Sequence, residues 1–237
     1  MGSTLPESAT NSAQWSVVRY YLVDRGRLFQ LIRRAEGLPS LLSHMAIMAG
    51  LFSALYGLTV GLYAGGWQVL YNIIKFPGVI LATLAVCVAA LYVLNSLAGS
   101  RLSVLQTTAV VLSAILVTAT LLAALTPPLA FLMLTSLREY SLVIFLNLVT
   151  ICLAGAGGAS FALQATKAVH DDEAVRTRCL KLMRVWMALY ALVGLQMLWL
   201  FRPYFRATDV FIRPLGEGGS AFEAFGRLIL NVIHSLL

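Results

Sequence analysis

The densest group of side chains that could do chemistry is the run His170, Asp171, Asp172 and Glu173. An imidazole and three carboxylates are ligand types that hold divalent cations, so a metal site is one interpretation. Consecutive residues do not converge easily on a single ion, whereas acidic residues ahead of a helix cap its free N–H groups and match its dipole. We therefore predict that these acids begin a helix at about Ala174, and we expect no metal and no cofactor.

No other pattern in the sequence points to catalysis. Cys87, Cys152 and Cys179 lie far apart without CxxC or Cys/His spacing, so they give neither a disulfide framework nor a zinc site. There is no glycine-rich nucleotide loop, GxSxG elbow, HExxH motif or kinase motif. The serines and histidines are not spaced as a triad. We expect a protein that is not an enzyme.

Ionisable residues inside apolar segments usually mark transport pathways, because burying a charge in lipid is costly. This sequence has almost none, and His44 lies where the first apolar segment meets the interface. The other notable polar residues are Asn95, Gln106, Asn147, Gln164 and Gln196. We expect them to form hydrogen bonds between helices. An ion-coupled or proton-coupled transporter is disfavoured, and a pore lined by neutral groups stays open.

Small residues recur at helical spacing in two places. One strip consists of Ser53, Gly57, Gly61 and Gly65, and the other lies within the run AGAGGAS at residues 154–160, including Gly155 and Gly158. Faces without bulky side chains let two helices approach closely. We favour packing inside one bundle, with an oligomerisation seam as the alternative.

Three arginines lie among aromatic residues near the end of the last apolar segment. They are Arg202, Arg206 and Arg213, and Tyr204, Phe205 and Phe211 lie between them. Arginines and aromatics at this depth commonly anchor a helix end among lipid headgroups, which is the interpretation we favour. The alternative is a structured external cap whose arginines dock a partner or an anionic lipid.

The composition indicates which elements must position these residues. The chain is 59% hydrophobic and 11% charged, whereas soluble domains carry roughly a quarter charged residues. Its uncharged runs reach the roughly 20 residues that a spanning helix needs, and no alternating ten-residue pattern suggests a barrel. The net charge of +7 then suits membrane surfaces better than nucleic acid. We predict an all-α, polytopic transmembrane bundle with amphipathic interfacial helices at both ends.

We divide the chain into four parts. Residues 1–14 form a polar tail, 15–40 a basic amphipathic interfacial helix ending near a bend at Pro39, 41–201 a five-span bundle, and 202–237 an external cap with a C-terminal amphipathic helix. The expected spans are residues 42–64, 77–98, 103–125, 140–165 and 185–201. Residues 67–75 read as a separate interfacial helix, with Gln68, Asn72 and Lys75 on its polar face, and residues 129–137 as an interfacial or re-entrant stretch.

Orientation follows from counting Lys and Arg on alternate sides of five spans. Eleven fall on the side of the N-terminus and six on the other side. The positive-inside rule therefore favours a cytoplasmic N-terminus and an external C-terminus. A four-span alternative, with the short run 185–201 only half inserted, would keep both ends inside.

One stretch of the chain resembles a known family of membrane proteins. Residues 76–106, with FPGVILATL and ALYVLNSLAGSRLS, resemble uncharacterised bacterial membrane proteins of the Yip1-like family. The resemblance implies a five-span protein of the bacterial inner membrane that acts without catalysis, and it assigns no functional residue.

Taken together, these patterns predict a membrane scaffold or accessory subunit that forms a homo-oligomer or joins a larger membrane complex. Its expected contacts are the lipid bilayer and anionic lipid headgroups, with no nucleic acid. The alternative is a channel or transporter for a neutral or small solute, formed by a homo-oligomer.

Overall fold

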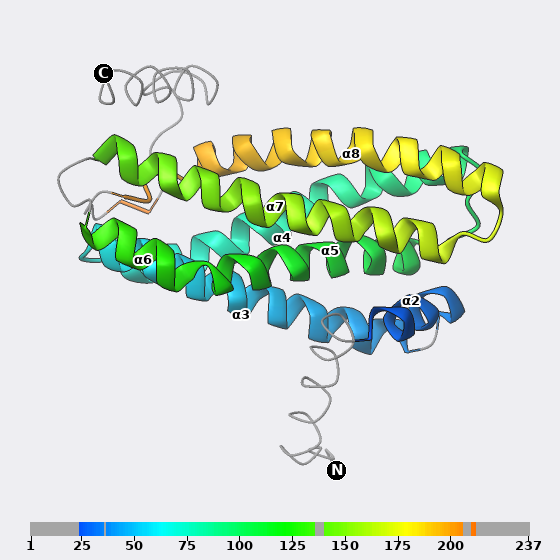
Figure 1. Cartoon of the computed structure of the whole chain (residues 1–237), viewed down its shortest axis with the longest axis horizontal. Helices are drawn as coiled ribbons and strands as arrows, with labels where there is room; N and C mark the ends of the chain where they lie inside the picture. The colour runs from blue at the N-terminus through cyan, green and yellow to red at the C-terminus, as the bar shows by residue number, and fades with distance from the viewer. Residues whose placement is uncertain (1–23, 36, 136–139, 206–209, 212–237) are drawn as a thin grey trace, which may run out of the picture.

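The computed structural model describes all residues except 1–23, 36, 136–139, 206–209 and 212–237. Its helices are α2 (Arg25–Arg34), α3 (Leu38–Ala64), α4 (Gln68–Leu97), α5 (Val104–Ala124), α6 (Thr126–Thr135), α7 (Tyr140–Val169) and α8 (Glu173–Leu200) (Figure 1). All of these except α2 and α6 are long and apolar enough to cross a membrane, which makes five candidate spans in the described chain. The prediction of an all-α, five-span bundle is confirmed, whereas the predicted C-terminal amphipathic helix lies outside the described residues.

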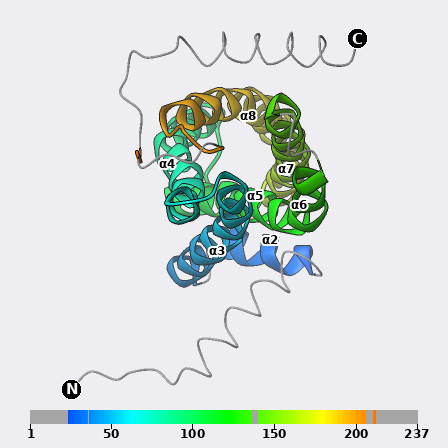
Figure 2. The same cartoon turned by 90° about the vertical axis from the view of Figure 1, so that its left-hand side faces the viewer.

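Helix α5 is the most deeply buried of the five candidate spans. In its most apolar stretch 61% of the residues are buried, against 11% in α8. Helices α4, α5, α7 and α8 form a ring in which α4 and α7 each contact both α5 and α8, and α3 packs outside the ring on α4 and α5 (Figure 2). Because lipid is as apolar as leucine, close packing of small and branched side chains holds such a ring together.

The predicted bend at Pro39, ahead of the first span, is wrong. Helix α3 begins at Leu38, and Pro39 lies in its first turn, where a missing N–H costs nothing. The chain turns earlier, at Ala35 and Gly37, which both have left-handed backbone angles (φ of 59° and 60°). The first span is therefore longer than predicted.

The basic helix α2 is held by the bundle. Leu28 and Ile32 are fully buried against it. The Gln106 side-chain amide donates to the carbonyl oxygens of Ile32 and Arg33, both at 3.0 Å, and thereby holds the last turn of α2. The apolar face of α2 therefore contacts helices of its own chain, and its arginines remain at the surface.

The predicted separate helix at residues 67–75 is also wrong. Helix α4 runs without a break from Gln68 through Pro77 to Leu97. A proline inside a helix removes one backbone hydrogen bond, and neighbouring helices in a bundle can compensate for that loss. The prediction that the helix beginning at about Ala174 continues into the fifth span is confirmed, because α8 extends over 28 residues as one helix.

The first small-residue strip is used within the chain. A side chain at Gly57 would collide with the carbonyl oxygen of Asn72, and one at Gly61 would come within 2.7 Å of the Val69 Cα. Ser53 is fully buried, and Gly65 ends α3 with a φ of 77°. At Gly57 and Gly61 the strip therefore faces α4, with no space for a helix of another chain.

Only part of the second small-residue strip lies in a close helix contact. A side chain at Gly158 would lie 2.7 Å from the Ala114 carbonyl oxygen of α5 and would collide with Thr118, whereas a side chain at Gly155 would meet open space. The close α5–α7 contact therefore depends on Gly158 and not on Gly155.

The α3–α4 contact generates a prediction. We expect Gly57→Ala to lower the free energy of unfolding by about 2 kcal/mol, because its methyl group must displace the α4 backbone. Gly50→Ala is the matched control in the same helix, since nothing lies within 4 Å of a side chain there and alanine favours a helix by about 1 kcal/mol. Thermal unfolding in detergent measures both, and equal midpoints would show that the contact is not close.

Candidate functional site

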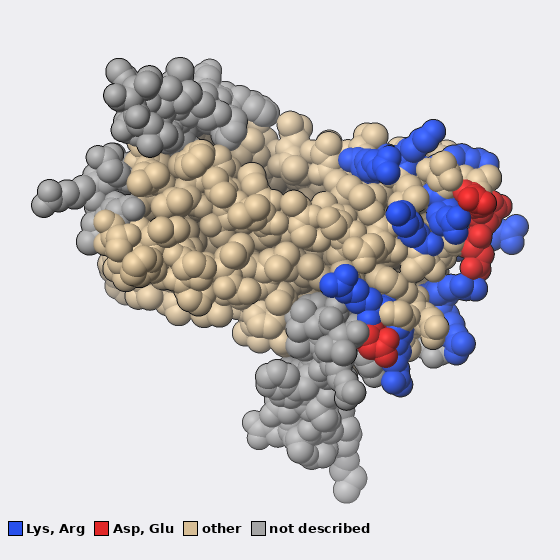
Figure 3. All heavy atoms as spheres, in the orientation of Figure 1, with Lys and Arg blue, Asp and Glu red and all other residues tan. Residues whose placement is uncertain are grey.

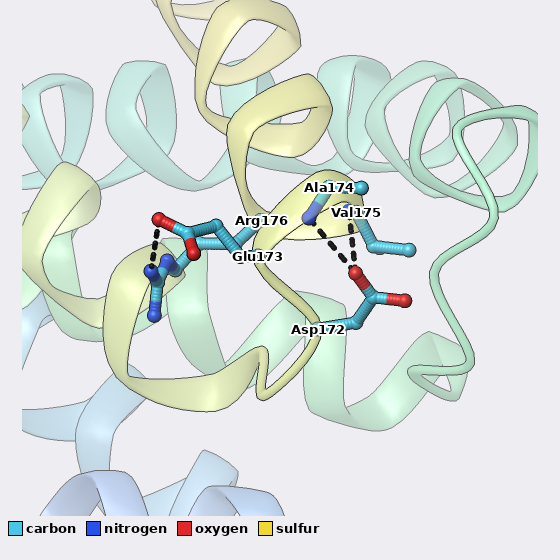
Figure 4. A network of polar contacts seen from close by, with 5 residues as sticks. All are labelled: Asp172, Glu173, Ala174, Val175 and Arg176. Carbon is cyan, nitrogen blue, oxygen red and sulfur yellow. Dashed lines mark hydrogen bonds and ion pairs between the residues drawn. The ribbon is translucent and has the colours of Figure 1, made fainter.

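The four residues at 170–173 have separate partners in the structure. Asp172 caps α8, its carboxylate accepting from the backbone N–H groups of Ala174 at 2.8 Å and Val175 at 3.3 Å, while Glu173 pairs with Arg176 (Figure 4). The predicted helix cap is confirmed.

The other two members of that run point elsewhere. Asp171 lies 2.8 Å from a guanidinium nitrogen of Arg33 on α2, and His170 contacts the Ser100 hydroxyl and the Thr166 carbonyl oxygen, each at 2.9 Å. Within the described residues, no three His, Cys, Asp or Glu side chains come together as metal ligands would. The run therefore ties the α7–α8 connection to α2 and to the α4–α5 connection.

Of the three predicted external arginines, only Arg202 is described. Its guanidinium stacks over the Trp199 ring, 3.8 Å from the ring centroid. Arg206 and Arg213 lie outside the described residues.

The group that sequence reasoning missed is the polar face of α4. Gln68, Asn72 and Lys75 are all fully buried, whereas Leu70 and Ile74 on the opposite face are about half exposed. The polar face of this part of α4 therefore points into the protein and not toward water as expected, because in a membrane only the apolar face can meet lipid. The expectation that the spans contain almost no buried charge is corrected by Lys75.

Lys75 lies about 10 Å along α4 from its first residue, at a rise of about 1.5 Å per residue. Its ammonium donates to the carbonyl oxygen of Pro203 at 2.7 Å and approaches the side-chain oxygen of Gln68 at 3.5 Å. The rings of Tyr71, Tyr204 and Phe211 surround it, with centroids 5.8, 5.4 and 5.2 Å from the nitrogen. Cation–π attraction is strongest in such desolvated surroundings. No described carboxylate pairs with this charge, so carbonyl dipoles and aromatic faces stabilise it.

The same α4 face holds the chain that follows α8. We call residues 203–205 and 210–211 the strap. The Asn72 amide donates to the Tyr204 carbonyl oxygen at 2.8 Å, and the Gln68 amide donates to the Val210 carbonyl oxygen at 3.2 Å. With Lys75 on Pro203, three side chains on successive turns of α4 bind three main-chain oxygens of the strap.

Aromatic contacts pack the strap against the bundle. The Tyr204 ring lies 5.3 Å from that of Phe76, and Phe211 meets Tyr71 edge-on at 5.2 Å. Burial of the Tyr204 phenol raises its pKa, so it stays protonated, and its hydroxyl has no hydrogen-bond partner in the described chain. The site therefore contains the fully buried ammonium of Lys75 and a buried, neutral phenol.

This arrangement is suited to holding a segment in place and not to reacting with a substrate. Lys75 has no solvent-accessible surface, so its amine cannot attack a substrate in this conformation. The spacing of Gln68, Asn72 and Lys75, at i, i+4 and i+7, is the signal in the sequence. In a membrane helix, such a polar stripe opposite apolar residues indicates an inward face.

A second buried polar group lies near the α4–α5 and α7–α8 connections. Asn95, Thr107, Thr166 and His170 line one small pocket, together with apolar residues. The Asn95 side-chain oxygen and the Thr107 hydroxyl are buried there without a hydrogen-bond partner in the described chain. A buried polar group that lacks a hydrogen-bond partner lowers the stability of the fold.

Several predicted interhelical hydrogen bonds are present. Asn147 accepts from the Tyr56 hydroxyl at 2.8 Å, and Gln164 accepts from Arg25 at 3.3 Å, in addition to the Gln106 bonds to α2. Gln196 on α8 is exposed and makes no hydrogen bond in the described part of the chain.

No protein-family model matches the sequence, and neither a curated protein nor a solved structure matches it. The resemblance of residues 76–106 to Yip1-like proteins stays a prediction.

The lysine site generates the second prediction. We expect Lys75→Met to speed amide hydrogen exchange in the strap about tenfold or more, because a hydrogen bond from a charged donor is worth roughly 1.5–3 kcal/mol. Exchange in α5 should stay unchanged, since the substitution also removes a buried charge and need not weaken the bundle. Hydrogen–deuterium exchange with mass spectrometry makes the measurement.

Ile74→Met is the matched control, because it places the same side chain on the exposed face of the same turn. Strap exchange should match that of the wild type in this variant. Equal strap protection in all three proteins would show that Lys75 does not hold the strap.

Proposed function

We propose that this protein is a non-enzymatic membrane scaffold or accessory subunit that binds a partner at the end of the bundle where the strap lies. The observation that carries the proposal is the strap itself. A buried lysine and two buried amides fix its backbone, although a buried cation is costly to maintain. This energetic cost is explained if a partner binds the strap and requires the backbone position that these contacts fix.

The contacts leave part of this region available to a partner. Because Gln68, Asn72 and Lys75 bind main-chain oxygens, the side chains of the strap take no part in these hydrogen bonds, and that of Val210 is 47% exposed. Gln196 lies one turn before the end of α8, exposed within a span and without a hydrogen bond in the described chain. Amide side chains at such positions commonly bond to a neighbouring helix. The strap and the end of α8 together make a partner surface.

The proposal includes an orientation. Among the described residues, every Lys and Arg except Lys75 and Arg202 gathers at the end that carries α2 and the α4–α5 and α7–α8 connections (Figure 3). The positive-inside rule favours a cytoplasmic location for this end, with the strap on the external side of the membrane. The Yip1-like resemblance supports a bacterial inner membrane and a role without catalysis.

A second candidate function is passage of a neutral or small solute. The unpartnered oxygens of Asn95 and Thr107, buried near the charged end of the ring, favour it, because they would be satisfied by a hydrated pathway. Solute flux into liposomes containing the purified protein tests this candidate, and no flux above that of empty liposomes would exclude it for the solutes assayed.

The scaffold proposal predicts a complex that depends on the strap. In mild detergent, protein from its native membrane should migrate on blue-native gels above the mass of a monomer and cross-link to a second chain. Lys75→Met should shift most of it to the monomer position, and Gln196→Leu should weaken the complex several-fold, since a hydrogen bond between membrane helices is worth about 0.6–2 kcal/mol.

Ile74→Met again serves as the control and should keep the complex. A wild-type protein that is monomeric and cross-links to nothing would refute the proposal. A complex that survives Lys75→Met unchanged would place the partner surface elsewhere.

A further inference from the structure

We propose that the exposed basic face of α8 at the charged end is a binding site for an anionic phospholipid. It consists of Arg178, Lys181 and Arg184, spaced three residues apart on one side of the helix and all exposed. This surface is separate from the strap, and the inference does not depend on the proposed function.

No described acidic residue neutralises these three basic side chains. None of these three side chains makes an ion pair or hydrogen bond within the described chain. The nearby acids are already engaged, because Asp171 pairs with Arg33, and Asp172 caps α8. The charge of the stripe therefore remains available to an external anion.

The rest of the charged end also carries more basic than acidic residues in the described chain. Glu173 pairs with Arg176, which occupies the remaining acid of the α7–α8 connection. The described residues at this end include ten Lys and Arg against four Asp and Glu (Figure 3). An excess of this size attracts anions from the membrane surface, at a favourable free energy for each basic residue.

The surface beside these cations fits a lipid better than a free anion. The same face of α8 continues directly into exposed apolar residues, Val185, Ala188 and Leu192. A headgroup phosphate can therefore lie against the basic residues while the acyl chain of the same molecule covers the apolar ones. A free phosphate could use only the first half of this surface.

The depth of the stripe fits this interpretation. Arg178 and Arg184 are about 9 Å apart along the helix axis at a rise of about 1.5 Å per residue. A headgroup layer is roughly 5–8 Å thick on each side of the bilayer, and long basic side chains extend toward it from below. The three cations thus cover the depth at which lipid phosphates lie, and Val185 marks the start of the hydrocarbon.

The test compares phosphatidylglycerol with phosphatidylcholine by native mass spectrometry of the full-length protein in detergent. We expect the wild type to bind phosphatidylglycerol about tenfold more tightly than phosphatidylcholine, and Arg178→Gln/Arg184→Gln to lose most of that preference. Arg101→Gln/Lys167→Gln is the matched control. It removes two basic residues from the same end that also lack an ion pair or hydrogen bond in the described chain.

The control should keep the preference within about twofold of the wild type. Equal loss in both double variants would mean diffuse attraction to the charged end, and no preference in the wild type would mean no anionic site. Either result overturns the proposal. Unchanged thermal unfolding of both variants, which we expect because all four side chains are exposed, excludes misfolding as the cause.

Discussion

The structure depends on the close approach of α3 and α4. Gly57 and Gly61 let the α4 backbone lie directly against α3, and this contact turns the polar face of α4 away from lipid. Once Lys75 is inside, its charge must be satisfied within the chain, because hydrocarbon offers no partner. The Pro203 carbonyl and the surrounding rings do so. The position of the strap is thus a consequence of the contact between the first two spans.

The two ends of the bundle solve different physical problems. At the charged end, ion pairs and caps join α2 to the helix connections, and the remaining cations face outward. At the other end, buried amides and an ammonium hold main-chain oxygens beneath aromatic rings. One end is therefore suited to the membrane surface and the other to holding a fixed shape.

The sequence predicts the fold class, the spans and the Asp172 cap, because hydrophobic run length and capping chemistry are local properties. It misplaces the start of the first span, since Pro39 is compatible with either a bend or a first helical turn. It misses the lysine site because the polar stripe on α4 is equally compatible with water and with a buried partner. Only the contact of the strap with α4, more than 120 positions later in the sequence, decides between them.

The most direct test of this account is an experimental map of the protein in lipid nanodiscs, at a resolution that places side chains. The account predicts the Lys75 ammonium within hydrogen-bond distance of the Pro203 carbonyl, with Asn72 on Tyr204 and the strap against α4. A map in which Lys75 extends toward the headgroups, with no chain packed against the polar face of α4, would contradict it.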